Sequence, residues 1–207
     1  MVHYKLSYFD VRALAEPIRI MFAMFDVPYE DHRVSVQEWA ELKKKTPFGQ
    51  MPVLEVDGVE IGQSAAIGRF LARKFGLAGQ NALEEALADG IVDQFKDFIF
   101  FFRQWTMPTF LEGDPAEIKR IATEIVAPAR DTYLGIVKRI LEKSTSGFLV
   151  GNSLTWADLV VADNLTSLVN GQFIDLKEEK TLAEFYEKIH SIPKIKEYVA
   201  KRKHSVL

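Results

Sequence analysis

The sequence of 207 residues contains no cysteine. This absence excludes disulfides, thiolate metal sites and a cysteine nucleophile on the protein. If thiol chemistry takes place here, the sulfur must therefore arrive with a ligand. Histidine is also scarce, and we predict no metal site because the four histidines show no metal-ligand spacing: His3, His32, His190 and His204.

Long apolar runs and a strong charge of one sign are missing as well. No segment approaches the length of a membrane span, and the N-terminus shows no signal-peptide pattern. The formal net charge of −3 creates no strong field for nucleic acid or an anionic membrane. We therefore expect a cytoplasmic protein with neither nucleic-acid nor membrane partners.

The first part of the chain alternates between strand and helix periodicity. Apolar side chains recur at every second position in some segments and at helical spacing in others. Asp57-Gly58 separates two apolar runs and predicts a tight hairpin. The order is βαβ, then ββα, with a last helix capped by Ser64. The expected elements cover residues 3–9, 14–25, 29–34, 51–56, 59–61 and 64–75.

Pro52 stands at the start of a run that otherwise reads as a buried strand. Proline lacks the N–H that a sheet ladder needs, so it belongs at a strand's first residue, at an edge or at a bulge. A cis Met51–Pro52 bond would turn the backbone of Met51 away from the sheet, where it could pair with an extended peptide. Because the helix that Ser64 opens offers its N-terminus to a carboxylate, we predict a small acidic peptide as ligand.

Strand signals stop at a glycine-bearing segment, residues 77–81. We predict that this segment links a first domain, residues 1–76, to an all-helical domain, residues 82–207.

The second domain should begin with a long helix over residues 82–104. Pro108 should prevent its continuation, because proline removes a hydrogen bond and clashes with the preceding turn. A second helix, over residues 115–143, should kink or break at Pro128. Thr155-Trp156-Ala157-Asp158 resembles a capping box at the start of a further helix, and two short helices follow.

A βαβ-ββα domain with a proline before its third strand suggests a thioredoxin-like fold. Redox members of that fold carry a Cys-x-x-Cys pair after the first strand, where this chain has Tyr8 to Arg12. The phenolic O–H of Tyr8 could donate a hydrogen bond to a ligand thiolate and lower the pKa of the thiol. A drop of about two units corresponds to about 2.7 kcal/mol. The alternative, that Tyr8 is a core aromatic residue with a satisfied hydroxyl, stays open here.

Five stretches, weak singly but specific in their joint spacing, carry a resemblance that covers essentially the whole chain. They are Tyr4–Phe9, Ala15–Arg19, Pro47–Gly58, Gln63-Ser64 and Leu154–Asp158. Together they resemble a cytosolic glutathione transferase. The class resembled is sigma, in its nematode-type branch, which the segment Asp93–Phe98 supports.

The resemblance implies a binding site for glutathione. Tyr8 would hold the sulfur as thiolate, and Ser64 with its neighbour would take the γ-glutamyl carboxylate. Trp39 and Lys43 would meet the glycyl end, although Trp39 could instead cover the core and Lys43 could belong to a solvated basic face. The implied glutathione-binding residues are Tyr8, Trp39, Lys43, Gly49, Gln50, Met51, Pro52, Gln63 and Ser64, with Asp97 from the partner subunit of a homodimer.

The resemblance also implies an apolar pocket for the second substrate between the domains, with Phe9, Phe102 and Trp105 as its expected walls. The chain departs from the vertebrate prostaglandin D synthases of this class at two positions. Leu14 stands where they have an arginine, and Lys96 stands where they have an acidic residue of a divalent-cation site. Both differences count against prostaglandin isomerisation and metal activation.

The implied function is the addition of the glutathione thiolate, as co-substrate, to electrophilic apolar compounds in detoxification. The alternatives are a ligandin-type binding protein for haem or other bulky apolar ligands, a glutathione-dependent prostaglandin isomerase, and a module for protein association. The electrophile cannot be named from the sequence, because apolar walls discriminate by only about 1–3 kcal/mol per methylene.

Overall fold

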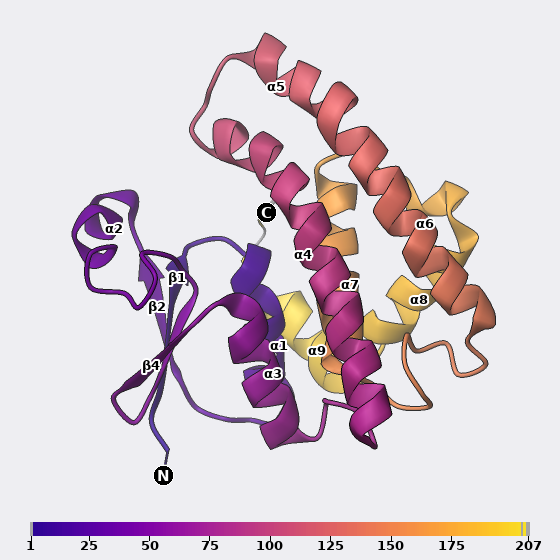
Figure 1. Ribbon diagram of the computed structural model, residues 1–207, viewed down its shortest axis with the longest axis horizontal. Coiled ribbons are helices and arrows are strands. Elements are labelled where there is room, and N and C mark those ends of the chain that lie inside the picture. Colours follow the sequence, from indigo (N-terminus) through magenta and orange to yellow (C-terminus); the bar gives the residue numbers. More distant parts are fainter. Residues whose placement is uncertain (1, 204, 206–207) are drawn as a thin grey trace.

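The computed structural model describes residues 2–203 and 205. A four-stranded sheet with flanking helices forms the N-terminal part, and helices form the rest (Figure 1). The sheet has the order β2-β1-β3-β4, in which β1 pairs parallel with β2 and antiparallel with β3. The fold is therefore a thioredoxin-like domain followed by an all-helical domain, as the sequence predicts. The strands are β1 (Tyr4–Phe9), β2 (Glu30–Val34), β3 (Val53–Val56) and β4 (Val59–Gly62).

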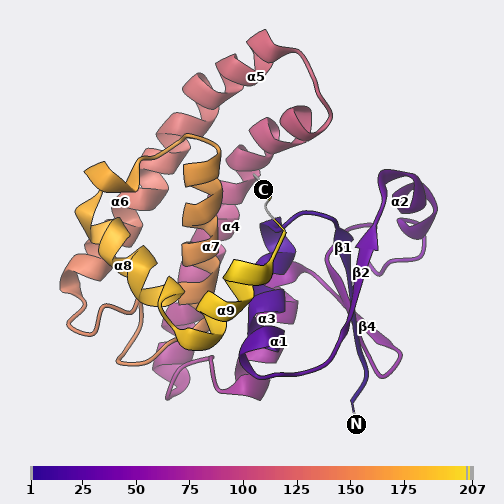
Figure 2. The same ribbon diagram turned by 180° about the vertical axis from the view of Figure 1, so that it is seen from behind.

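The core of the first domain forms where the sheet meets α1 (Glu16–Met24) and α3 (Ser64–Phe75). These helices lie between the sheet and the helical domain (Figures 1 and 2). Buried and half-buried residues alternate along β1, as the period of two in its sequence requires. The Tyr4 ring on this strand packs against Phe22 of α1 with 5.2 Å between the ring centroids.

A short helix that the expected order lacks, α2 (Val36–Leu42), separates β2 from β3. Ser35 and Glu38 form a capping box at its start: the Ser35 hydroxyl accepts from the Glu38 N–H at 3.1 Å, and the Glu38 carboxylate accepts from the Ser35 N–H at 2.9 Å. A serine followed three residues later by glutamate is the sequence signal of this motif. The predicted order βαβ-ββα was therefore incomplete by one helix.

The helical domain begins with α4 (Ala82–Phe110), which continues through Pro108. The expectation that Pro108 prevents continuation was wrong: the proline costs the helix one backbone hydrogen bond, yet α4 continues for two more residues before it ends at Phe110. The predicted second helix runs without interruption over residues 115–143, as α5 (Pro115–Ile121), a π-helical turn over Ala122–Val126 and α6 (Ala127–Lys143). Pro128 stands in the first turn of α6, so the helix does not break there, and the irregular turn lies just before the proline. The remaining helices are α7 (Trp156–Asn170), α8 (Lys180–His190) and α9 (Pro193–Lys201), with short 3-10 turns at Ala13–Ala15 and Leu176–Glu178.

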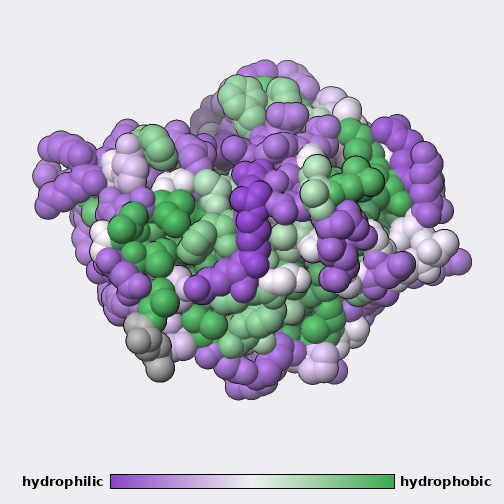
Figure 3. All heavy atoms as spheres, turned by 60° about the horizontal axis from the view of Figure 1, so that its bottom comes forward, coloured by the Kyte–Doolittle hydropathy of each residue, from purple (hydrophilic) through white to green (hydrophobic). Residues whose placement is uncertain are grey.

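The central helix is α7, in which every residue from Trp156 to Leu168 is buried. The predicted capping box at its start is present, formed by Thr155 and Asp158. Large apolar side chains outside the core, such as Leu83 and Phe100, remain exposed on other helices. Figure 3, which views the end of the molecule that faces down in Figure 1, shows apolar and hydrophilic residues mixed over that face. Within residues 2–203 and 205, no helix is both long and apolar enough to cross a membrane.

The two domains touch closely where Gly68 of α3 faces Trp156 of α7. A Cβ at position 68 would lie 2.6 Å from Cζ3 of Trp156 and 2.8 Å from its Cε3, far inside van der Waals contact. The indole exposes 1% of its surface, so it has no free space into which to move. The backbone N–H of Trp156 also donates to the carbonyl of Leu77, which follows α3, at 2.9 Å. Packing between the domains therefore requires glycine at position 68.

We expect Gly68→Ala to lower the free energy of unfolding by about 1–3 kcal/mol, because the added methyl overpacks the contact with Trp156. Urea unfolding followed by circular dichroism measures this change. Gly135→Ala is the control, since a Cβ at position 135 of α6 meets nothing within 4 Å. That variant should be as stable as the wild type or more stable by up to about 1 kcal/mol. Equal effects of the two substitutions would contradict the prediction.

Candidate active site

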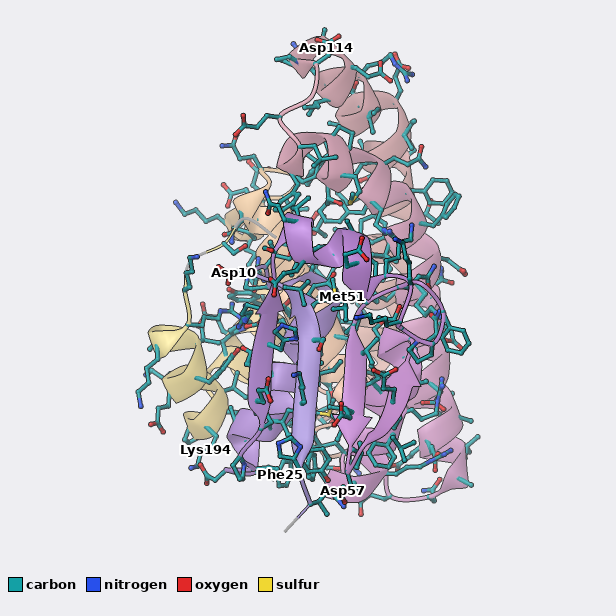
Figure 4. All side chains as sticks on the ribbon, turned by 90° about the vertical axis from the view of Figure 1, so that its left-hand side faces the viewer. Asp10, Phe25, Met51, Asp57, Asp114 and Lys194 are labelled. Carbon is teal, nitrogen blue, oxygen red and sulfur yellow. The ribbon has the colours of Figure 1, made fainter. Side chains whose placement is uncertain are left out.

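The sheet register brings the predicted site residues to one end of the sheet. Ser7 pairs with Val53, so Tyr8 lies beside Pro52. Val53 in turn pairs with Gly62, so the residues after β4 reach the same end. The Met51–Pro52 bond is cis, as predicted. In Figure 4, Met51 and Asp10 mark this end of the sheet, and Asp57 in the hairpin marks the opposite end.

Gln63 and Ser64 join the end of β4 to the start of α3. The Gln63 amide donates to the side-chain oxygen of Gln50 at 2.8 Å, which ties this junction to the segment before Met51. The predicted cap was off by one residue: Gln63 occupies the cap position with a φ of 71°, and Ser64 is the first helical residue. No side chain among the described residues caps α3. Its first backbone N–H groups therefore point toward the site without a side-chain partner.

Trp39 and Lys43 come from the end of α2, the helix that the sequence prediction missed. The half-buried Trp39 meets the Phe9 ring edge to face, with 5.9 Å between the centroids. Lys43 is exposed, and a Cβ at Gly49 would lie 3.9 Å from its Cε. Gly49 has a φ of 63°, in the left-handed region that favours glycine. These contacts place Lys43 beside Gly49, just before Gln50, and Trp39 beside Phe9 at the end of β1.

Tyr8 is 8% exposed, and burial raises the pKa of its hydroxyl. A hydrogen bond from the Leu14 backbone and the charges of Arg103 and Arg19 oppose this rise. The Arg19 guanidinium lies 6.0 Å from the centroid of the Tyr8 ring. With a raised pKa, the hydroxyl keeps its proton at neutral pH and can donate it in a hydrogen bond to an anion.

The charged and polar groups around Tyr8 differ from those that the sequence suggested. Arg12 lies near Tyr8 in the sequence, but its guanidinium binds Asp163 on α7. Arg19 and Arg103 face Tyr8 instead, and Leu14 contributes through its backbone, which a leucine supplies as well as an arginine does. Nothing in the sequence pattern marks these three groups, because they reach Tyr8 through tertiary packing.

Among the expected pocket walls, Phe9 lies nearest the sheet end, and its ring centroid is 6.5 Å from that of Phe110. Phe102 exposes only 2% of its surface and Trp105 only 8%, and both pack on Phe173. Phe102 is therefore a core residue of the helical domain, which leaves its expected contact with a substrate without support. Phe110 was missed because the helix was expected to end before Pro108.

Asp97 is exposed on α4, and its predicted role on a second subunit stays a prediction. In the described part of the chain, no three His, Asp or Glu side chains lie together as a metal site would require. His204, one of the four histidines considered for such a site, lies outside the described residues.

Comparison with known proteins identifies the family. Residues 4–73 match the N-terminal domain of glutathione S-transferases, and residues 101–202 match their C-terminal domain. The chain belongs to the glutathione S-transferase family. Proteins of this family use glutathione as co-substrate, and the residues gathered at the sheet end lie in the part of the chain that matches the family's N-terminal domain.

Close relatives of this glutathione S-transferase come from nematodes. It is 64% identical to "Glutathione S-transferase 4" of Caenorhabditis elegans over the full length of both chains. A solved structure of a Nu-class glutathione S-transferase from Haemonchus contortus covers both chains fully at 43% identity, with a TM-score of 0.84. Rat hPGDS in complex with a quinoline is 33% identical over 99% of this chain and all of the other, with a TM-score of 0.88. The comparisons therefore establish the glutathione S-transferase family and its likeness to nematode members. They do not assign the chain to the sigma class.

Proposed function

We propose that this glutathione S-transferase conjugates glutathione to electrophilic apolar compounds, with Tyr8 holding the sulfur as thiolate. The observation that carries the proposal is the buried, protonated hydroxyl of Tyr8 beside the cis Met51–Pro52 bond. A hydrogen bond to the thiolate favours the charged form of the thiol and so lowers its pKa. Since the chain lacks cysteine, glutathione supplies the only thiol of the reaction.

The tripeptide would extend across the end of the sheet. The backbone of Met51 would pair with the cysteinyl unit, because β3 joins the ladder only from Val53 onward. Gln63 and Ser64 would take the γ-glutamyl carboxylate at the N-terminus of α3, where backbone N–H groups and the helix dipole favour an anion. Trp39 and Lys43 would contact the glycyl end, with Gly49 and Gln50 between them and Met51.

In the reaction, the thiolate sulfur attacks the electrophilic carbon of the second substrate. A sulfur–carbon bond forms, and the leaving group departs with the bonding electron pair. With an activated alkene there is no leaving group, and the adjacent carbanion takes a proton from water. The protein contributes by orienting the thiolate and by keeping it ionised near neutral pH.

The second substrate would lie against Phe9 and Phe110, whose rings face each other across the domain boundary. Trp105, which packs on Phe173 in the helical core, would adjoin this wall. The boundary follows the predicted division into residues 1–76, the linker 77–81 and residues 82–207. Apolar walls of this kind select for hydrophobic character more than for one compound.

A homodimer would complete the site, because Asp97 of one subunit would face the γ-glutamyl amine bound to the other. Exposed apolar side chains on the same helix support this proposal: Phe100 is 68% exposed and Phe101 is 40% exposed. Sedimentation at several protein concentrations tests the assembly. We retain the sigma class and the cytoplasmic location as proposals, on the motifs and the composition that suggested them.

Ser64→Ala should weaken glutathione binding about 10- to 150-fold, because a hydrogen bond to a carboxylate contributes about 1.5–3 kcal/mol. Isothermal titration calorimetry with glutathione measures the dissociation constant. Ser191→Ala is the control, since the exposed Ser191 hydroxyl follows α8, in the helical domain, and donates to the carbonyl of Lys188 at 2.8 Å. Unchanged affinity in Ser64→Ala would contradict the assignment of the carboxylate site.

The conjugation of chlorodinitrobenzene, a model electrophile, tests the proposed function directly. Turnover that requires glutathione and depends on Tyr8 would support it. Binding of haem by a catalytically poor wild type, or conversion of prostaglandin H in preference to the model electrophile, would favour the alternatives. No feature of the described residues favours either alternative over conjugation.

A further inference from the structure

Buried charged side chains anchor the loop between β1 and α1. Arg12 in this loop is only 4% exposed. Its Nη1 donates to the carboxylate of Asp163 at 2.7 Å, and its Nη2 donates to the hydroxyl of Ser167 at 3.2 Å. Both partners lie on α7. A guanidinium of the thioredoxin-like domain is thus fixed to the central helix of the other domain.

A second buried arginine holds the backbone of the same loop. The Nη1 of Arg19 on α1 donates to the carbonyl of Val11 at 2.7 Å and to the carboxylate of Glu16 at 3.1 Å. Between Arg12 and Leu14, Ala13 has a φ of 36°, in the left-handed region that an L side chain disfavours. The loop keeps this conformation because its neighbours on both sides are tied down.

The C-terminal segment closes the cluster from outside. The Nη1 of Arg202 donates to Asp163 at 3.2 Å and to Glu16 at 3.1 Å. The carbonyl of Ser205 accepts from Nε of Arg12 at 3.4 Å. In both ribbon views, the chain after α9 runs toward the start of α1 (Figures 1 and 2). Asp163 therefore receives two arginines, one from each end of the chain.

This cluster holds the loop that directly follows the strand of Tyr8. Arg19, whose Nη1 holds the Val11 carbonyl of the loop at 2.7 Å, lies 6.0 Å from the centroid of the Tyr8 ring. Against the rise that burial causes, the Leu14 backbone, two residues after Arg12, lowers the pKa of the Tyr8 hydroxyl through a hydrogen bond. A donor to the phenolic oxygen polarises the O–H bond and makes that O–H a stronger donor to an anion. The position of the Leu14 N–H thus affects how well Tyr8 stabilises a thiolate.

We propose that the ion pair between Arg12 and Asp163 positions the Leu14 N–H against Tyr8 and thereby sets how readily bound glutathione ionises. Arg12 and Asp163 are positioning residues: they act through the loop and through Tyr8. The proposal rests on the proposed role of Tyr8. It assigns a part of the thiolate-stabilising machinery to α7, in the helical domain, although the tripeptide itself lies on the other domain.

The test compares full-length Arg12→Gln, Asp163→Asn, the double variant and Ser167→Ala with the wild type. The pH profile of kcat/KM for chlorodinitrobenzene, measured at saturating glutathione, gives the pKa of the bound thiol. The ultraviolet absorbance of the thiolate in the glutathione complex gives the same pKa independently. Asp10→Asn is the matched control: this carboxylate lies two residues before Arg12 but is half exposed and pairs with Lys203 and Arg33.

We expect Arg12→Gln to raise the thiol pKa by about one unit, with the KM for glutathione little changed. This shift lowers kcat/KM about tenfold at pH values well below the thiol pKa and about threefold near neutral pH. Ser167→Ala should produce a smaller shift in the same direction, and Asp10→Asn none. The double variant should shift the pKa no further than the larger single change, because both substitutions break one pair. If Asp163→Asn does not fold, Arg12→Gln and Ser167→Ala decide the question.

A pH profile of folded Arg12→Gln and Ser167→Ala that coincides with the wild type would overturn the proposal, even if both variants are less stable. Tyr8→Phe is measured alongside to separate two failures. If the wild type does not lower the thiol pKa relative to Tyr8→Phe, the proposed role of Tyr8 fails. If it does and Arg12→Gln has no effect, only the positioning role fails.

Discussion

Tyr8→Phe should lower kcat with a model electrophile about a hundredfold at neutral pH while leaving glutathione affinity nearly unchanged. Removal of one preorganised donor to a developing or bound anion costs about 10²–10³ in rate. The substitution removes only the hydroxyl, so the ring still fills its buried position. Without that donor the pKa of the bound thiol should return toward about 8.5, the ordinary value for a thiol.

The pH dependence provides the sharper measurement. The difference in kcat between the wild type and Tyr8→Phe should shrink as the pH rises above the thiol pKa of the variant, because the thiolate then forms without the hydrogen bond from Tyr8. Tyr4→Phe is a matched control on the same strand and the same face: the buried hydroxyl of Tyr4 has no hydrogen-bond partner among the described residues. That variant should keep full activity. Equal rates for Tyr8→Phe and the wild type at neutral pH would refute the role of Tyr8.

Asp158→Ala should have the largest effect on stability, lowering the free energy of unfolding by about 3 kcal/mol or more. The carboxylate is fully buried and accepts from the backbone N–H of Leu149 at 2.8 Å and of Thr155 at 2.7 Å. It also accepts from the Thr155 hydroxyl at 3.0 Å. Alanine leaves both backbone donors buried without acceptors, which costs about 1–3 kcal/mol each. Denaturant unfolding measures the loss.

Asp158→Asn tests the charge separately from the hydrogen bonds. Burial raises the pKa of Asp158 from its ordinary value of 3.8 to about 6, against the opposing effect of the donors from Leu149 and Thr155. Because the folded-state pKa lies above the unfolded one, the stability linked to this proton is present below pH 3.8 and is lost as the pH rises through about 6.

The stability difference between the wild type and Asp158→Asn should therefore change by about 3 kcal/mol across that range, in the direction that disfavours the wild type at higher pH. Unfolding curves of both proteins at pH values on either side of the range test this sign. A difference that does not vary with pH would contradict it, as would an alanine variant as stable as the wild type.

Much of the thioredoxin-like domain could be predicted from local patterns because its signals are short-range. The alternation in β1, the Asp57-Gly58 turn and the unusual place of Pro52 each depend on neighbouring residues. The helix α2 escaped prediction although Ser35 and Glu38 carry a capping-box signal, since its few residues include none that is buried. Amphipathic periodicity, the main signal for a helix, is therefore weak there.

Candidate site residues were predictable where sheet register places them and not where tertiary packing does. Tyr8, Pro52 and Gln63 follow from the pairing of three strands. Arg19 and Arg103 approach Tyr8 from other helices, and no spacing in the sequence shows this. The error at Pro108 had a local cause: a proline removes one hydrogen bond without always ending a helix, and here α4 continues for only two residues beyond it.

The strand pairing at the site has a consequence for how variants of this protein can fail. A slip of one residue between β1 and β3 would turn every core side chain of the strand toward solvent, and the same slip would separate Tyr8 from Pro52. Burial of the hydrophobic core therefore also fixes the register that aligns the binding site. A molecule that has buried Leu6 and Leu54 has, by the same event, aligned the strand ends that are proposed to receive glutathione.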